Sequence, residues 1–524
     1  MSITFRGIAS LALVALLASC QDQITDPTIP LNAAQGGKPT PTPCAGLPSQ
    51  TTGIILTPSV ATVPLGGTLP LTATNQKGAL IPACALKWSS SNTLVATVAA
   101  TGVVTGIAAG GPVTIKAQTS GKHPMQGVAT VTVDNTVATV EVRPSTATIE
   151  PGQSVQFTAI ARNSAGREVT GKTPGWNSDN DAVARVSSTG LATGVTGGDA
   201  IITAQVDGKS GTGSVRVLGW RKLADDATTA AVATTSAFDP AGRTVFLAAN
   251  NDGIQPDLWR LDLAAGTWTH VLQTNSLLGK YRQYQFDPSS GGRLLTFWDG
   301  LGAVFSIPTA GGAWAGLGGG GAGDAYYEGG SFMDPVTGRL SLLMGYGGGT
   351  HKNTFWQFDG ASWILRGTSG TPPARLGPRL ATDPSAKRVF LAGGHLNPSN
   401  NYTDVWSLDL NTLAWTNILP SGLGPQVISA FWGYVPSLNR LYVYGGRMIS
   451  NGAMIGQTSA QLAYVDLASS TIVPVTTAGP SPGPRLSSTG AEFYYDAPSR
   501  RLIFGGGLDG TNTWHLDVWA YYLP

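Results

Sequence analysis

Apolar residues along this chain come in short runs separated by glycine- and proline-containing turns, a pattern that predicts strands almost throughout. Before residue 218 polar and apolar residues alternate, as in strands that bury one face. Beyond it the runs become nearly continuous, for example at residues 245–247, 389–391 and 502–504, which predicts strands buried on both faces. No sustained 3.6-residue apolar period occurs outside the N-terminus. We therefore expect an all-β protein.

A tryptophan recurs at nearly regular intervals through residues 218–524. By subtraction, the spacings between successive copies are 48, 46, 49 and 52 residues, for Trp220, Trp268, Trp314, Trp363 and Trp415. A strand-filled period of about 40–50 residues is typical of a β-propeller. Each repeat also contains a turn, most often Asp-Pro, and these six turns begin at Asp239, Asp287, Asp334, Asp383, Val435 and Asp496. Six turns predict six blades.

The sixth repeat ends at Pro524, after its third strand. Residues 219–223 match the fourth strand of the first repeat, so that Trp220 aligns with Trp268. We therefore expect the first strand of the propeller to complete the last blade, with Trp220 closing the ring. Such closure removes an exposed sheet edge.

Two tandem units of about 85 residues, 51–134 and 135–217, precede the propeller. Their landmarks recur in the same order, with 86 residues from Pro58 to Pro144 and 88 from Trp88 to Trp176. Short alternating strands of this kind predict β-sandwiches. The order of motifs resembles the bacterial Ig-like group 2 domain. The resemblance implies modules that act mostly as spacers on surface proteins and in some cases as adhesins.

The propeller resembles kelch repeats, in which a Gly-Gly pair precedes an aromatic strand and then a tryptophan. The pairs begin at Gly347, Gly393, Gly445 and Gly505, and the first two repeats lack them. The resemblance covers residues 219–524. It implies that the loops joining strands two and three, and those joining blades, meet at one end of the channel. We expect a ligand face there, with Arg282, His351, Arg375, Arg379, His395, Arg447, Arg485 and His515 as candidates. Alternatively, several of these arginines pack between blades.

The N-terminus predicts export. An apolar run too short to span a membrane ends at residues 17–20, Leu-Ala-Ser-Cys, which resembles the lipobox of bacterial lipoproteins. The resemblance implies a signal peptide at 1–19, lipidation of Cys20 and, with Gln21 next, an outer-membrane anchor at the cell surface. An ordinary secretory signal is the alternative. Residues 20–50 are rich in Pro and Thr and predict an extended tether.

Cys44 and Cys84 are the remaining cysteines. In an oxidising compartment this pair predicts a disulfide, unless they are two separate small apolar residues.

Charged residues make up 12% of the chain and the net charge is +2, which argues against a nucleic-acid partner. No GxSxG, HExxH or phosphate-binding loop occurs, the histidine spacing matches no metal-ligand pattern, and we expect no cofactor. The sequence thus favours a non-catalytic recognition propeller that binds a glycan or an envelope or extracellular protein. A surface or periplasmic hydrolase using channel aspartates, and a purely structural envelope component, stay open as alternatives.

Overall fold

The computed structural model describes residues 46–226, 232–251, 255–271, 283–297, 302–319, 328–487 and 492–524. The predicted signal peptide, Cys20, most of the tether, Cys44 and Arg282 lie outside these residues, so the structure does not bear on them. Cys84 is disulfide-bonded, and its pairing with Cys44 stays a prediction. Among the described residues, none forms a helix with the length and apolarity needed to cross a membrane.

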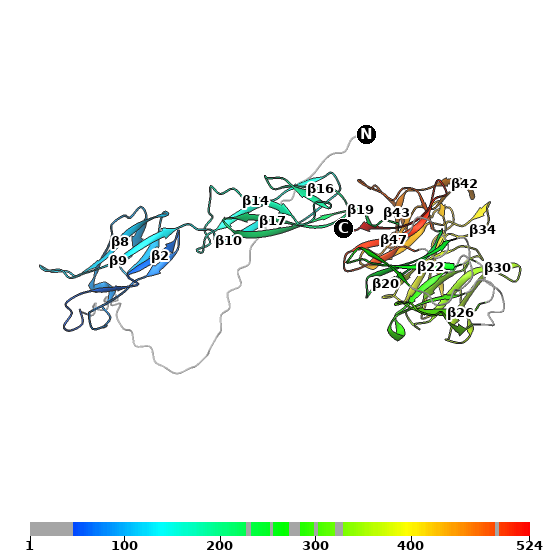
Figure 1. Cartoon of the computed structure of the whole chain (residues 1–524), viewed down its shortest axis with the longest axis horizontal. Helices are drawn as coiled ribbons and strands as arrows, with labels where there is room; N and C mark the ends of the chain where they lie inside the picture. The colour runs from blue at the N-terminus through cyan, green and yellow to red at the C-terminus, as the bar shows by residue number, and fades with distance from the viewer. Residues whose placement is uncertain are drawn as a thin grey trace, which may run out of the picture. The chain divides into compact units, whose positions relative to one another are not determined.

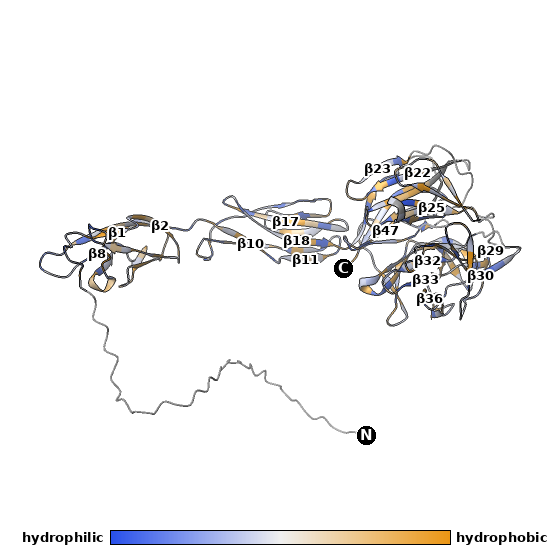
Figure 2. Ribbon diagram, turned by 90° about the horizontal axis from the view of Figure 1, so that it is seen from below, coloured by the Kyte–Doolittle hydropathy of each residue, from blue (hydrophilic) through white to orange (hydrophobic). Residues whose placement is uncertain are grey.

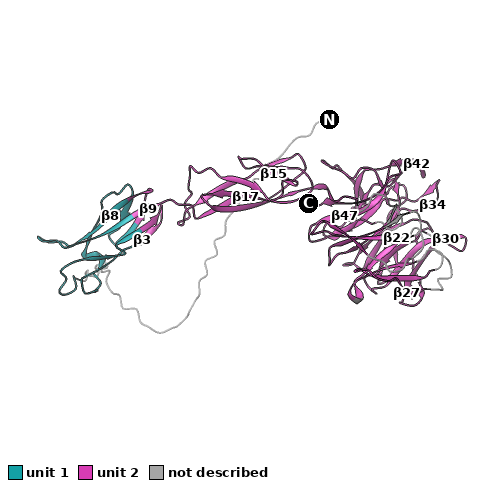
Figure 3. Ribbon diagram, viewed as in Figure 1, with its two compact units in different colours: residues 1–61, 69–104, 112–131 teal, residues 62–68, 105–111, 132–524 magenta. Residues whose placement is uncertain are grey.

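Two compact units divide the chain (Figure 3). The first comprises residues 1–61, 69–104 and 112–131, and the second comprises residues 62–68, 105–111 and 132–524.

The sheets of residues 51–134 have the strand pattern of a sandwich. One sheet has the order β2 (Val60–Pro64), β9 (Gln126–Asp134), β8 (Gly110–Gln118) and β5 (Lys87–Ser90). The others are β3 (Thr68–Pro70), β7 (Val103–Gly106) and β6 (Ala96–Val98), and the pair β1 (Ile55–Thr57) and β4 (Thr72–Thr74). Alternate residues of β8 and β9 are buried, as the alternating sequence predicts.

The second sandwich repeats this arrangement. Its main sheet has the order β11 (Thr146–Ile149), β18 (Lys209–Val217), β17 (Gly198–Val206) and β14 (Gly175–Ser178). The other sheets are β12 (Ser154–Gln156), β16 (Leu191–Gly194) and β15 (Ala184–Val186), and the pair β10 (Thr139–Arg143) and β13 (Thr158–Arg162). Trp176 packs, partly buried, against the core of this sandwich.

Six antiparallel sheets follow as the blades of a propeller within the described residues (Figure 1). The first blade consists of β20 (Val232–Asp239), β21 (Thr244–Asn251), β22 (Gln255–Asp262) and β23 (Thr267–Val271). The second consists of β24 (Tyr284–Asp287), β25 (Arg293–Phe297), β26 (Val304–Pro308) and β27 (Ala315–Gly318). The third consists of β28 (Gly330–Met333), β29 (Leu340–Gly347), β30 (Thr350–Phe358) and β31 (Trp363–Arg366). The next two are β32 (Arg379–Asp383), β33 (Arg388–Ala392), β36 (Val405–Asp409) and β37 (Trp415–Leu419); and β39 (Phe431–Val435), β40 (Arg440–Tyr444), β43 (Leu462–Asp466) and β44 (Thr471–Val475). Hydrophobic residues fill these strands (Figure 2), and residues 389–392 of β33 are all buried.

The sixth blade confirms the predicted closure. It consists of β46 (Tyr494–Asp496), β47 (Arg501–Asp509), β48 (Trp514–Tyr522) and, as its outermost strand, β19 (Gly219–Ala224). Trp220 lies opposite Tyr521 in the antiparallel register of β19 and β48. Its ring is 1% exposed and lies 4.6 Å from the ring of Tyr444 and 5.8 Å from that of Phe504, between centroids. The first strand of the propeller, β19, therefore packs against both its own blade and the fifth blade.

The connections between the second and third strands of the fourth and fifth blades contain strands of their own. Residues 393–403 include the hairpin of β34 (His395–Asn397) and β35 (Asn400–Asn401). Residues 447–459 include β41 (Arg447–Ser450) and β42 (Ala453–Thr458), and β38 (Val427–Ile428) pairs with β41. A further short strand, β45 (Arg485–Leu486), pairs with β47.

Candidate functional site

The innermost strands of the blades surround a central channel. Consecutive innermost strands, from β20 round to β46, contact one another, and the sixth blade meets the first where the ring of Tyr494 lies 5.6 Å from that of Phe238. The C-terminal halves of these strands and the turns that follow them enclose a cavity of about 890 Å³. Aromatic residues line much of it: Phe238, Phe286, Phe332, Trp432, Tyr494 and Tyr495.

The aspartates of the turns are engaged locally. The carboxylate of Asp239 accepts hydrogen bonds from two backbone N–H groups of its own turn, each at 3.0 Å. Asp287 accepts one from Arg293 at 2.8 Å, and Asp383 accepts one from Arg388 at 3.0 Å. Burial acts to raise the pKa of Asp287 and Asp383, but these hydrogen bonds outweigh it and lower both pKa values. Asp287 and Asp383 are thus ionised at neutral pH, and the carboxylates of Asp239, Asp287 and Asp383 all serve to hold their own turns.

Glu492 differs from the aspartates. It lines the cavity just before β46, and its burial raises its pKa to about 8, against the opposing effects of the Arg379 charge and a hydrogen bond with Gln285. At neutral pH most molecules therefore carry this carboxyl group in its protonated, uncharged form. A protonated carboxyl both donates and accepts hydrogen bonds.

Arg379, at the start of β32, interacts electrostatically with both glutamates of the propeller, Glu328 and Glu492. Its Nη2 donates to the carbonyl oxygen of Ser487 at 3.0 Å, and its side chain is almost completely buried. Burial lowers its pKa to about 10, while the charges of Glu328 and Glu492 act in the other direction. The guanidinium therefore remains cationic at neutral pH.

Three of the predicted ligand-face residues come together near Glu328. His395 Nε2 lies 4.0 Å from Glu328 Oε2. Burial lowers the pKa of His395; Glu328 opposes this shift, while the positive charge of Arg379 and the neighbouring His351 reinforce it. His351, Arg379 and His395 thus form one electrostatic group with Glu328.

The other predicted residues do not join that group. Arg375 is fully buried and forms a bidentate ion pair with Asp404, and Arg485 is buried against Asp517. Both guanidinium groups are buried and paired, so neither is available to a ligand. These two arginines therefore have a structural role, as the alternative interpretation of the kelch resemblance expected. Arg447 Nη1 lies 3.8 Å from Met454 Sδ in the β41–β42 hairpin. His515 lies in a separate cluster near Asp509.

Most of the cavity lining lies toward the other end of the channel from the predicted face, and Glu492, just before β46, links the two because it lines the cavity and interacts electrostatically with Arg379. The cavity surrounds the ends of the innermost strands, whereas His351, Arg379 and His395 lie where such strands begin or in loops at that end. Sequence reasoning did not select Glu492. Its one distinguishing signal is that Glu328 and Glu492 are the only glutamates after residue 217.

Comparisons with known proteins agree with this architecture. The bacterial Ig-like domain (group 2) matches residues 50–133 and 136–217, and the KLHDC2/KLHL20/DRC7 Kelch-repeats domain matches residues 335–524. The kelch match begins in the third blade, so the first two blades, which lack the Gly-Gly pair, lie outside it.

One curated relative is "Ice-binding protein 1" of Shewanella frigidimarina (strain NCIMB 400), 36% identical over 173 residues, which are 32% of this chain and 19% of that protein. The match thus spans about a fifth of that relative's length. Among solved structures, "Structure of YjhT" is similar with a TM-score of 0.43 and 15% identity over 56% of this chain and 96% of that one.

The combination of these modules fits a surface recognition protein. The chain carries two bacterial Ig-like domains of group 2 and a C-terminal kelch-repeat domain.

Proposed function

We propose that this protein is an exported lipoprotein, anchored in the outer membrane through Cys20, whose propeller binds a glycan built from uncharged sugars. The Ig-like domains act as spacers, and the propeller acts without catalysis. The proposed ligand site is the channel cavity.

The observation that carries this proposal is the protonated Glu492 within an aromatic cavity. Sugars offer hydroxyl groups for hydrogen bonding and apolar ring faces for stacking. Trp432, Tyr494 and Tyr495 supply aromatic surface, while Glu492 and Gln285 supply neutral donors and acceptors. A charged ligand would gain little from a carboxyl group that is itself uncharged.

A protein partner at the opposite, histidine-bearing end is the rival form of the recognition hypothesis. Its residues would be His351, Arg379 and His395. The name of the Shewanella relative raises ice binding as a further alternative, but the matched segment is a small part of that protein.

A glycan array probed with the full mature chain tests the proposal, with a pull-down from envelope extracts and a panel of chromogenic glycosides and esters run in parallel. We expect selective binding of neutral glycans and no turnover. Capture of an envelope protein without any glycan signal would contradict the glycan proposal. Turnover that a cavity carboxyl variant abolishes would contradict the non-catalytic one.

A further inference from the structure

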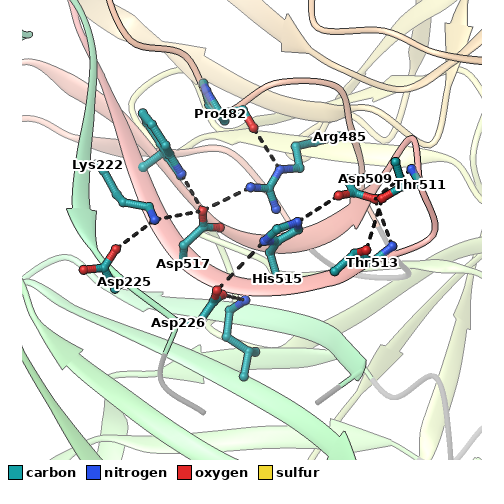
Figure 4. Close-up of polar contacts among 12 residues, drawn as sticks. Lys222, Asp225, Asp226, Pro482, Arg485, Asp509, Thr511, Thr513, His515 and Asp517 are labelled. Carbon is teal, nitrogen blue, oxygen red and sulfur yellow. Dashed lines mark hydrogen bonds and ion pairs between the residues drawn. The ribbon is translucent and has the colours of Figure 1, made fainter. Parts of the chain in front are cut away.

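We propose that Asp226, His515 and Asp517 form a binding site for a divalent metal ion, best suited to Zn²⁺, at the closure of the propeller ring. The site is distinct from the channel cavity. It joins the segment that leaves β19, near the start of the propeller, to β48, near its end (Figure 4).

The donor atoms already lie close together. One atom from each of the three side chains lies within 4.8 Å of the others. Zinc takes imidazole nitrogen and carboxylate oxygen ligands at about 2.0–2.2 Å, which in a tetrahedral site places them about 3.3–3.5 Å apart. Small side-chain rotations would therefore bring the three into coordination. The fourth position would be left to water.

His515 is oriented as a metal ligand. Its Nε2 lies 3.1 Å from Asp509 Oδ2, and its Nδ1 faces Asp226 Oδ2 at 4.0 Å. Histidines that bind metals usually donate the N–H of their other ring nitrogen to a carboxylate, and Asp509 is placed to accept it from Nε2. Asp509 is itself fixed by hydrogen bonds from the backbone of Thr511 and Thr513.

Asp517 provides a second, independent indication. Its side chain is 3% exposed. Its Oδ2 accepts hydrogen bonds from Arg485 at 3.1 Å and Trp519 at 2.7 Å, yet its Oδ1 is buried without a hydrogen-bond partner among the described residues. A buried carboxylate oxygen without a partner is costly, and a cation would remove that cost.

The charge balance also favours a divalent cation. The exposed Asp225 pairs with Lys222, so these two charges cancel. The rest of the cluster holds three carboxylates, Asp226, Asp509 and Asp517, and one cation, Arg485. Apart from the imidazole, three negative charges and one positive charge leave a net charge of −2. One divalent ion neutralises it.

Calorimetric titration of the chelator-treated full chain with ZnCl₂ tests the site. We expect one Zn²⁺ per chain, and at least a tenfold loss of affinity in each of the ligand variants Asp226→Asn and His515→Gln. Asp509→Asn should weaken binding about 10- to 100-fold by releasing the imidazole. The matched control is Asp225→Asn. The carboxylate of Asp225 is 90% exposed and pairs with Lys222, so this variant should bind zinc like the wild type.

Thermal unfolding supplies the second readout. Zinc should raise the unfolding temperature of the wild type and of Asp225→Asn, but not that of Asp226→Asn. Asp226 is the informative position because its side chain is partly exposed, whereas loss of Asp517 would strand the buried Arg485 charge. Failure of the wild type to bind micromolar Zn²⁺, or unchanged zinc binding in Asp226→Asn, would overturn the proposal.

Discussion

Individual carboxyl groups of the propeller differ in protonation because their neighbours differ. Asp383 has an arginine partner and accepts hydrogen bonds from the Ser385 hydroxyl and the Ala386 N–H, which keep its pKa low despite burial. Glu492 faces a channel of aromatic rings, and the positive charge of Arg379 only partly offsets its burial, so its pKa rises to about 8. The protonated Glu492 is what makes the cavity suited to neutral ligands.

This difference predicts a pH-dependent effect of Glu492→Gln. Because the folded-state pKa is raised from 4.5 to about 8, the folded chain keeps a proton that the unfolded chain releases between these values. The wild type therefore has its full stability below this window and loses stability as the pH rises through it, by up to about 1.4 kcal/mol per pH unit. Glutamine cannot ionise, so the variant should gain relative to the wild type from pH 5 to pH 8. Unfolding midpoints across this range give the measurement, and a difference independent of pH would contradict it.

The buried pair of Arg375 and Asp404 gives a second residue-level prediction. Asp404→Asn leaves the guanidinium charged inside the fourth blade, so we expect a loss of about 3–5 kcal/mol in unfolding free energy. The exposed pair of Arg143 and Glu141 provides the control, since Glu141→Gln should change stability by less than about 1 kcal/mol. Denaturant unfolding compares the two. Equal losses in unfolding free energy for Asp404→Asn and Glu141→Gln would contradict a structural role for Arg375.

At the scale of elements, the strand β19 decides how the ring closes. Trp220→Ala should cost about 3–5 kcal/mol because it empties a fully buried position between the fifth and sixth blades. Trp268, at the equivalent position of the first blade, is only partly buried and should cost less on the same substitution. Thermal unfolding of the propeller distinguishes them. Deletion of residues 218–223 that left the unfolding unchanged would contradict closure by this strand.

The blades could be predicted from the sequence because their tryptophans and turns recur periodically. The tryptophan spacing and the six turns predicted the number of blades, and the unmatched strand around Trp220 predicted the closure. The short strands β34, β35, β41 and β42 were expected as loops, since glycine- and asparagine-rich hairpins lack an apolar alternation.

The site was less accessible to sequence reasoning. The assignment of residues to loops at one end of the channel correctly grouped His351, Arg379 and His395. It also selected Arg375 and Arg485, because the sequence alone does not reveal which arginine has a buried carboxylate partner. Glu492 shows no motif. Its significance depends on which side chains surround it in three dimensions.

At the scale of the whole molecule, Arg216 connects the second Ig-like domain to the propeller within the second compact unit. From β18 it donates to the carbonyl oxygens of Leu523, Ser499 and Arg500 at 2.7–2.8 Å, and it pairs with Asp199 at 2.7 Å. The side chain is 7% exposed. The second Ig-like domain is therefore joined to the propeller by hydrogen bonds from the Arg216 guanidinium to the propeller's backbone.

Arg216→Met should uncouple these two domains. We expect a loss of about 1.5–3 kcal/mol and the separation of one calorimetric transition into two, because hydrogen bonds from a charged donor are lost at the junction. Differential scanning calorimetry makes the comparison, and Arg143→Met is the control, because this arginine is 61% exposed and pairs with Glu141 on its own strand β10. A single unshifted transition in Arg216→Met would show that the junction is held in another way.

The proposed recognition function depends on the channel cavity being the ligand site. Ala497 lies exposed at the cavity lining, so Ala497→Trp should fill the entrance without disturbing the core. Thr350 is exposed toward the opposite end, as the first residue of β30 beside His351, and Thr350→Trp is the matched control. Glycan-array binding by both variants and the wild type is the most direct measurement. We predict that Ala497→Trp loses binding and that Thr350→Trp keeps it. Binding that survives Ala497→Trp but disappears in Thr350→Trp would place the ligand on the loop face and contradict the cavity proposal.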